Sequence, residues 1–138
     1  LVSFVAYEVD SIIRALRGAI GRQVQIDVLL ESSDKHGGRV TYDSVEAMKS
    51  ILPSIDVYVW SSEKKSLPGQ LSGAVHAKCA VADGELAFIT SANLTSAAME
   101  RNMELGVLVK GGELPFELHR HLEALISTEM VETVSGNL

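Results

Sequence analysis

An Asp-Gly pair at positions 83 and 84 lies between two apolar runs, and no other local feature constrains the fold of this chain as strongly. Asp-Gly favours a two-residue turn, because both residues tolerate the positive φ values that such a turn requires. Residues 74–82 and 85–91 are therefore predicted to form an antiparallel β-hairpin. A two-residue turn would place Ser91 directly opposite His76.

The first thirty residues predict a βαβ unit. The chain begins with an apolar stretch typical of a buried strand, and residues 11–20 carry apolar side chains at helical spacing. Residues 24–30 alternate at first and then become continuously apolar, as expected of a second strand. Two strands joined by one helix over this length are expected to be parallel.

The rest of the chain continues this mixed pattern. A parallel unit followed by a hairpin predicts an α/β domain with a mixed β-sheet flanked by helices. The further elements expected are a helix over 43–52, a strand over 56–60, a short helix over 96–100, a strand over 103–109 and an amphipathic helix over 114–126.

Composition fits one globular domain. The chain has 138 residues, of which 46% are hydrophobic and 22% charged, and its formal net charge is −6. This acidic balance argues against a free-standing, non-specific nucleic-acid binder, which would need a dense basic face. The chain starts without Met and inside an apolar stretch. We therefore expect residues 1–138 to be a single domain that forms the C-terminal half of a longer chain.

The single cysteine, Cys79, excludes an internal disulfide and a zinc-type ligand set. No apolar run approaches the roughly 20 residues needed to span a bilayer, and the first residues lack a basic leader. We therefore expect a cytoplasmic protein with no membrane span, no metal and no cofactor.

The predicted hairpin gathers polar side chains at one end. Residues two apart in a strand share a face, so His76 and Lys78 project together, away from Cys79. Ser91 and Asn93 follow the second strand on the same side. These side chains suit a phosphate: an ammonium charge, two neutral donors, and an imidazole that can attack phosphorus.

These residues resemble the HKD motif of the phospholipase D superfamily, which is His-x-Lys-x4-Asp-x6-Gly-Ser-x-Asn. Positions 76–83 read His-Ala-Lys-Cys-Ala-Val-Ala-Asp, and positions 90–93 read Thr-Ser-Ala-Asn. Only Thr90 departs from the pattern, since the family has Gly there. Asp83 supports the turn, and Glu104 resembles the downstream acidic position of the family. The segment also resembles the phospholipase D-like component of bacterial DISARM phage-defence systems.

The resemblance implies a role for each matching residue. His76 would be the nucleophile or the general acid, while Lys78 and Asn93 would bind phosphate oxygens. Ser91 would add a further phosphate contact. Glu104 would accept from the other ring nitrogen of His76 and stabilise the imidazolium.

Two structural alternatives remain open at this point. Ser91 and Asn93 could instead cap the helix that follows them. Glu104, inside an apolar strand, could form an ion pair with Arg101 or Lys110 rather than serve chemistry.

The function implied is a metal-independent phosphodiesterase working through a covalent phosphohistidine. One histidine attacks and a second protonates the leaving alcohol, so a second HKD half is needed, from the same native chain or from a homodimer. Lys64-Lys65 and the lack of an amphipathic membrane-binding helix favour nucleic acid over phospholipid as the substrate. The alternative is a non-catalytic phospholipase D-like half that serves dimerisation or partner binding.

Overall fold

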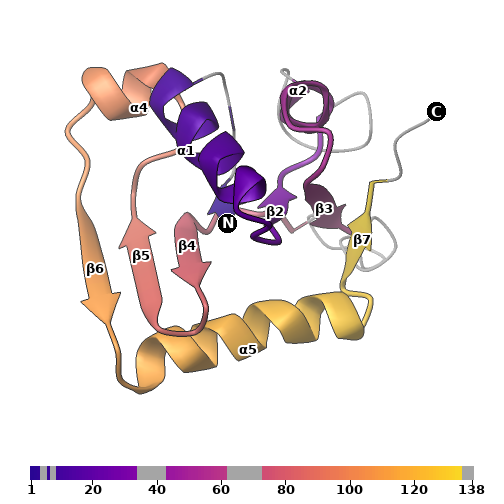
Figure 1. Cartoon of the computed structure of the whole chain (residues 1–138), viewed down its shortest axis with the longest axis vertical. Coiled ribbons are helices and arrows are strands. Elements are labelled where there is room, and N and C mark those ends of the chain that lie inside the picture. Colours follow the sequence, from indigo (N-terminus) through magenta and orange to yellow (C-terminus); the bar gives the residue numbers. More distant parts are fainter. Residues whose placement is uncertain (4–5, 7–8, 34–42, 62–72, 135–138) are drawn as a thin grey trace.

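The fold consists of one mixed sheet with helices on both sides (Figure 1). The computed structural model describes residues 1–3, 6, 9–33, 43–61 and 73–134. Its elements are β1 (Val2–Ser3), α1 (Asp10–Gly21), β2 (Asp27–Leu30), α2 (Ser44–Ile51), β3 (Asp56–Trp60), β4 (Cys79–Ala82), β5 (Leu86–Thr90), α4 (Ser96–Glu100), β6 (Gly106–Lys110), α5 (Glu113–Ser127) and β7 (Val131–Thr133).

The seven strands are ordered β6-β5-β4-β1-β2-β3-β7. Strands β1, β2 and β3 run parallel, with β1 and β2 joined through α1 as the βαβ pattern predicts. All other pairings are antiparallel. The expected α/β class and mixed sheet are therefore confirmed.

Alternating side chains on the central strands give the sheet two buried faces. Val28 and Leu30 of β2 pack with Ile13 of α1 and Met48 of α2 on one face. Leu29, from the same strand, belongs to the opposite cluster, which α5 covers with its own apolar side chains. The sheet thus lies between α1 and α2 on one side and α5 on the other.

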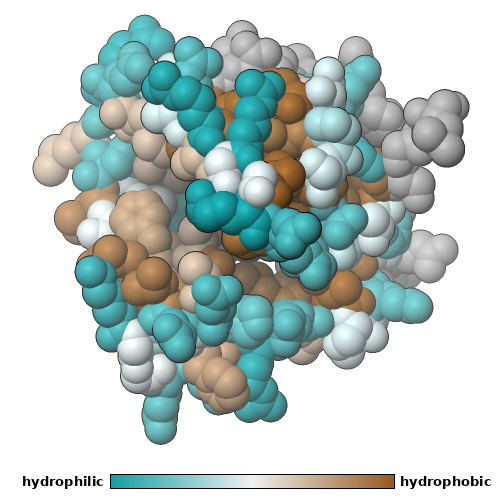
Figure 2. Space-filling view, viewed as in Figure 1, coloured by the Kyte–Doolittle hydropathy of each residue, from teal (hydrophilic) through white to brown (hydrophobic). Residues whose placement is uncertain are grey.

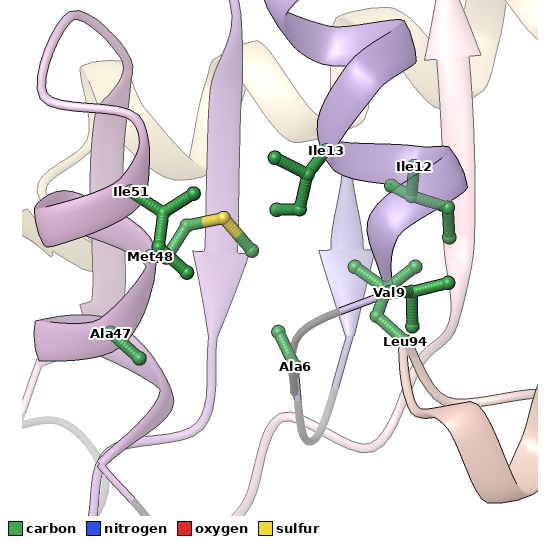
Figure 3. Close-up of a pocket in the computed structure, with 8 residues that line it drawn as sticks. All are labelled: Ala6, Val9, Ile12, Ile13, Ala47, Met48, Ile51 and Leu94. Carbon is green, nitrogen blue, oxygen red and sulfur yellow. The ribbon is translucent and has the colours of Figure 1, made fainter.

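A small apolar cavity remains between α1 and α2 (Figure 3). Its volume is about 20 Å³, which is room for one water and far below a typical ligand pocket. Its wall consists only of apolar side chains, and Figure 3 shows two of them, Ile13 and Met48, pointing toward each other across the space between the helices. This cavity is a space within the core and does not define a functional site.

The hairpin forms as predicted, but its register is shifted by one residue. Asp83 and Gly84 have φ values of 55° and 68°, and Glu85 N–H donates to Ala82 O at 3.0 Å, as in a two-residue turn. The ladder nevertheless pairs Ala82 with Leu86. Glu85 is an extra residue in the second strand, which is a bulge.

The expected pairing of His76 with Ser91 is therefore wrong. The pairs run from Ala82–Leu86 to Cys79–Ile89, and beyond them Thr90 N–H donates to Lys78 O at 3.1 Å. Strand β4 begins only at Cys79, so His76 lies in a segment that leads into the sheet.

The last strand, β7, was not expected from the sequence. Its three residues, Val-Glu-Thr, carry no alternating pattern long enough to predict a strand. They pair antiparallel with β3, which would otherwise leave its backbone groups unpaired at the sheet edge. Among the described residues, no helix has both the length and the apolar character needed to cross a membrane.

Candidate active site

Three chain segments bring the HKD side chains to one end of the sheet: the segment before β4, the residues after β5, and the residues before β6. Figure 1 shows the start of β4, the end of β5 and the start of β6 at the same end of these antiparallel strands. His76 and Ser91 are exposed there, while Lys78, Asn93 and Glu104 are partly buried. The sequence-predicted site residues therefore share one region, except for Asp83.

Lys78 is the centre of the first group of contacts. Its Nζ donates to the carbonyl oxygen of His76 at 2.7 Å and lies 3.5 Å from His76 Nδ1. Partial burial lowers the pKa of the Lys78 ammonium, and the carboxylate of Glu104 opposes this shift. A cation and an imidazole thus stand side by side, which is a suitable pair for binding and attacking a phosphate.

Glu104 is held by hydrogen bonds from neutral side chains. Ser91 Oγ donates to Glu104 Oε2 at 2.5 Å, and Asn102 Nδ2 donates to Oε1 at 3.2 Å. These two bonds lower the pKa of the Glu104 carboxyl; desolvation opposes them, and the charge of Lys78 adds to the lowering. The carboxylate is therefore kept ionised beside Lys78.

This arrangement differs from the alternative of a structural ion pair. The hydrogen bonds described on Glu104 come from Ser91 and Asn102, and among the described residues no ion pair joins Glu104 to Arg101 or Lys110. Asn102 was not singled out in the sequence. The sequence signal for its contact with the carboxylate is its position two residues before Glu104.

Asn93 lies in a short connection that the sheet anchors. The next residue, Leu94, donates its N–H to Ser3 Oγ at 3.3 Å and forms an isolated parallel bridge with Ala6. Within the described parts of the chain, Asn93 Oδ1 is buried without a hydrogen-bond partner. The alternative role as a helix cap is wrong, because Thr95 caps α4 by accepting from Ala98 N–H at 3.2 Å.

Thr90, the departure from the family pattern, is accommodated without left-handed backbone. Its hydroxyl donates to Leu105 O at 3.3 Å and accepts from Ala92 N–H at 3.1 Å. The second bond makes a local turn of the Ser/Thr type. Thr90 thus contributes to the turn that presents Ser91.

Asp83 lies at the opposite end of the hairpin from the other motif residues. Its neighbour Gly84 approaches α5, where an added Cβ would lie 3.7 Å from Phe116. This placement fits the expected role of Asp83 in the turn. Lys64 and Lys65 lie outside the described residues. Across the described ranges, no three His, Cys, Asp or Glu side chains form a group that could hold a metal ion.

Comparison with known proteins identifies the family. Residues 1–126 match the family described as "Cardiolipin synthase, PLD-like domain". The chain therefore belongs to the phospholipase D-like family. A search of curated proteins finds no match.

Two similar solved structures support the fold. NucT from Helicobacter pylori is 17% identical with a TM-score of 0.74, over 95% of this chain and 79% of that one. Nuc from Salmonella typhimurium, a phospholipase D family member, is 23% identical with a TM-score of 0.69, over 98% of this chain and 78% of its own. The phospholipase D-like fold expected from the motif is thus confirmed.

Proposed function

We propose that this chain is a phosphodiesterase that works without a metal, through a covalent phosphohistidine formed on His76. The observation that carries this proposal is the approach of Lys78 Nζ to within 3.5 Å of His76 Nδ1, next to a carboxylate held by Ser91. Membership of the phospholipase D-like family supports a phosphodiester as the substrate.

The proposed reaction has two balanced steps. A ring nitrogen of His76 forms a bond to phosphorus, the bond to the leaving alcohol breaks, and a second histidine gives that alcohol its proton. Water then attacks phosphorus, the nitrogen–phosphorus bond breaks, and the second histidine takes the proton from the water. Lys78 and Asn93 bind phosphate oxygens, and the negative charge of Glu104 stabilises the cationic imidazole.

The second histidine is proposed to come from a second copy of this chain. A single unit of this kind covers 79% of NucT and 78% of Nuc, which leaves neither chain room for two units. The loop beside Glu104 also exposes two large apolar side chains, Met103 and Leu105. An apolar surface next to an incomplete site fits an isologous interface across a two-fold axis.

Exposed apolar side chains also continue from this loop along strands β5 and β6. Strand β6 is the end of the sheet, and Figure 2 shows apolar side chains gathered over β5 and β6. Phe88, Val107 and Leu108 are among those exposed on these strands. Contact with the second copy would cover part of this surface.

Nucleic acid is the proposed substrate. The paired lysines at 64 and 65 in a predicted loop of the sequence support it. Single-stranded DNA and phospholipid vesicles, given to the same preparation, distinguish the two substrate classes.

The test is His76→Ala, with His119→Ala as the control, because His119 is a partly buried residue of α5 beside the Gly84 turn, at the other end of the hairpin from His76. We expect His76→Ala to abolish cleavage of bis-p-nitrophenyl phosphate and of single-stranded DNA, while His119→Ala and added EDTA leave turnover unchanged. An EDTA-sensitive activity that survives in His76→Ala would overturn the mechanism. No turnover from an intact dimer would favour the non-catalytic alternative.

A further inference from the structure

Glu31 is a completely buried carboxylate at the end of β2. It follows the apolar residues of that strand directly, and its exposed fraction is 0%. A carboxylate in such a place is costly unless hydrogen bonds compensate for the lost water. An apolar residue at position 31 would continue the apolar sequence of β2 without that cost. The presence of Glu at this position therefore indicates a specific role for its carboxylate.

The contacts of Glu31 lead to the candidate active site. Its Oε2 accepts the backbone N–H of Val75 at 2.6 Å, across 44 positions of sequence. Ser32 Oγ donates to the other oxygen, Oε1, at 3.3 Å. Val75 is itself buried, and it is the residue immediately before His76.

The segment that carries His76 begins outside the strand ladder. It precedes β4, which begins at Cys79, so ladder pairing does not fix its first residues. The contacts after Val75 include the bond from Lys78 Nζ to His76 O at 2.7 Å and that from Thr90 N–H to Lys78 O at 3.1 Å. Glu31 therefore fixes the start of the segment at Val75, while Thr90 of β5 fixes its end at Lys78.

We propose that Glu31 is a positioning residue for His76, acting through the backbone of Val75. This inference rests on the proposed function of His76 as the nucleophile. The buried carboxylate fixes the peptide that precedes His76 and so sets the direction from which the imidazole reaches phosphorus. Because attack needs a narrow range of geometry, a small displacement of the ring lowers the rate much more than it lowers binding.

The chemistry assigned to Glu31 is that of an acceptor, which makes two substitutions informative. Glu31→Leu keeps the approximate volume but leaves Val75 N–H without its acceptor. Glu31→Gln keeps an oxygen that can accept from Val75. Ser32→Ala is the matched control, because it removes the donor to Oε1 and leaves the bond to Val75 in place.

The experiment measures kcat and KM for bis-p-nitrophenyl phosphate, together with amide hydrogen exchange, on the full chain. We expect Glu31→Leu to lower kcat by about 10- to 100-fold, with KM within about threefold of wild type. Glu31→Gln is expected to recover most of kcat, and Ser32→Ala to match wild type. A kcat for Glu31→Leu within about twofold of wild type would overturn the proposal.

Amide exchange separates positioning from a general loss of stability. Faster exchange at Val75 and His76 in Glu31→Leu, with strands β2 and β3 still protected, supports the proposal. Faster exchange throughout the sheet, with no recovery by Glu31→Gln, would overturn it. If Glu31→Leu does not fold, Glu31→Asp replaces it, because the shorter carboxylate withdraws from Val75 without removing the charge.

Failure of the proposed function can be recognised separately. A wild-type chain with no phosphodiesterase turnover would overturn the proposed function. Amide exchange at Val75 would then be the only test of the contact between Val75 and Glu31. Unchanged protection at Val75 in Glu31→Leu would overturn the positioning role whatever the activity.

Discussion

Ser91 and Glu104 are joined by a hydrogen bond of 2.5 Å, in which the serine hydroxyl donates to the carboxylate. The same hydroxyl oxygen accepts the backbone N–H of Leu105 at 3.1 Å. One side chain thus connects the end of β5 with the approach to β6. This bridge locates the acid of the site beside Lys78, and it explains why Ser in the motif has a structural role as well as a proposed phosphate contact.

Glu104→Gln tests the charge of this acid. The amide keeps the shape of the side chain but removes the negative charge proposed to stabilise protonated His76. We expect kcat to fall by about 100-fold, measured with bis-p-nitrophenyl phosphate. The control is Glu100→Gln, an exposed acid on α4 with no part in the site. Full turnover in Glu104→Gln would reduce Glu104 to a structural role.

The pH dependence of stability also depends on Glu104. Hydrogen bonds from Ser91 and Asn102, with help from the charge of Lys78, lower the pKa of this carboxyl below its ordinary 4.5. A depressed folded-state pKa stabilises the protein above the unfolded-state value, and that contribution is lost as pH falls through the folded-state pKa.

The expected readout is a difference between two denaturation series. Above pH 5 the free energies of unfolding of wild type and Glu104→Gln should differ by a constant amount. Below pH 4.5 that difference should shrink, because Glu104 of the unfolded wild-type chain takes up a proton before Glu104 of the folded protein does. Urea denaturation from pH 3 to 8 measures both. A difference that stays constant down to pH 3 would contradict the lowered pKa.

Thr90→Gly would restore the residue that the family pattern has at this position. Thr90 lies in ordinary strand backbone, and its hydroxyl bonds Leu105 O and Ala92 N–H. We therefore expect Gly to lower the free energy of unfolding by about 1–2 kcal/mol, through lost hydrogen bonds and added chain entropy. Thr90→Ser keeps the hydroxyl and should lie between the two. A more stable Thr90→Gly protein would show that the hydroxyl bonds contribute nothing.

Local patterns in the sequence predicted most elements, and the exceptions have physical causes. Strands β2 and β3 and helix α5 follow from long apolar patterns, and the HKD spacing indicated the fold. The bulge at Glu85 depends on how two strands pair, and β7 depends on the unpaired edge of β3. Neither is encoded by its own residues alone.

In the candidate site, too, local spacing predicted some contacts and could not predict those between distant parts of the chain. Spacing placed His76 beside Lys78, as their contacts show, whereas the predicted pairing of Ser91 with His76 was wrong. The bond from Val75 to Glu31 spans 44 positions and depends on the sheet order, in which β1 lies between β4 and β2, so no local signal could reveal it. The predicted contact between Glu104 and His76 remains a prediction, because the hydrogen bonds described on that carboxylate come from other residues.

The stoichiometry of the active species follows from the two-histidine mechanism. Attack and protonation need two histidines at one phosphate, yet the motif supplies only His76. The proposed mechanism therefore needs a second HKD half, and on the proposal that a second copy of this chain supplies it, the two His76 side chains would lie near a two-fold axis. Met103, fully exposed next to Glu104, would lie in or beside the contact, where a charge would be buried without a partner.

Met103→Glu should therefore convert the proposed active dimer into an inactive monomer with an intact fold. Light scattering gives the mass and circular dichroism the fold, while activity is measured over a range of protein concentrations. Val24→Glu, at an exposed apolar residue outside the hairpin, is the control and should remain an active dimer. A wild-type chain that turns over substrate as a monomer would overturn the two-histidine account, because no second copy would then be present to protonate the leaving alcohol.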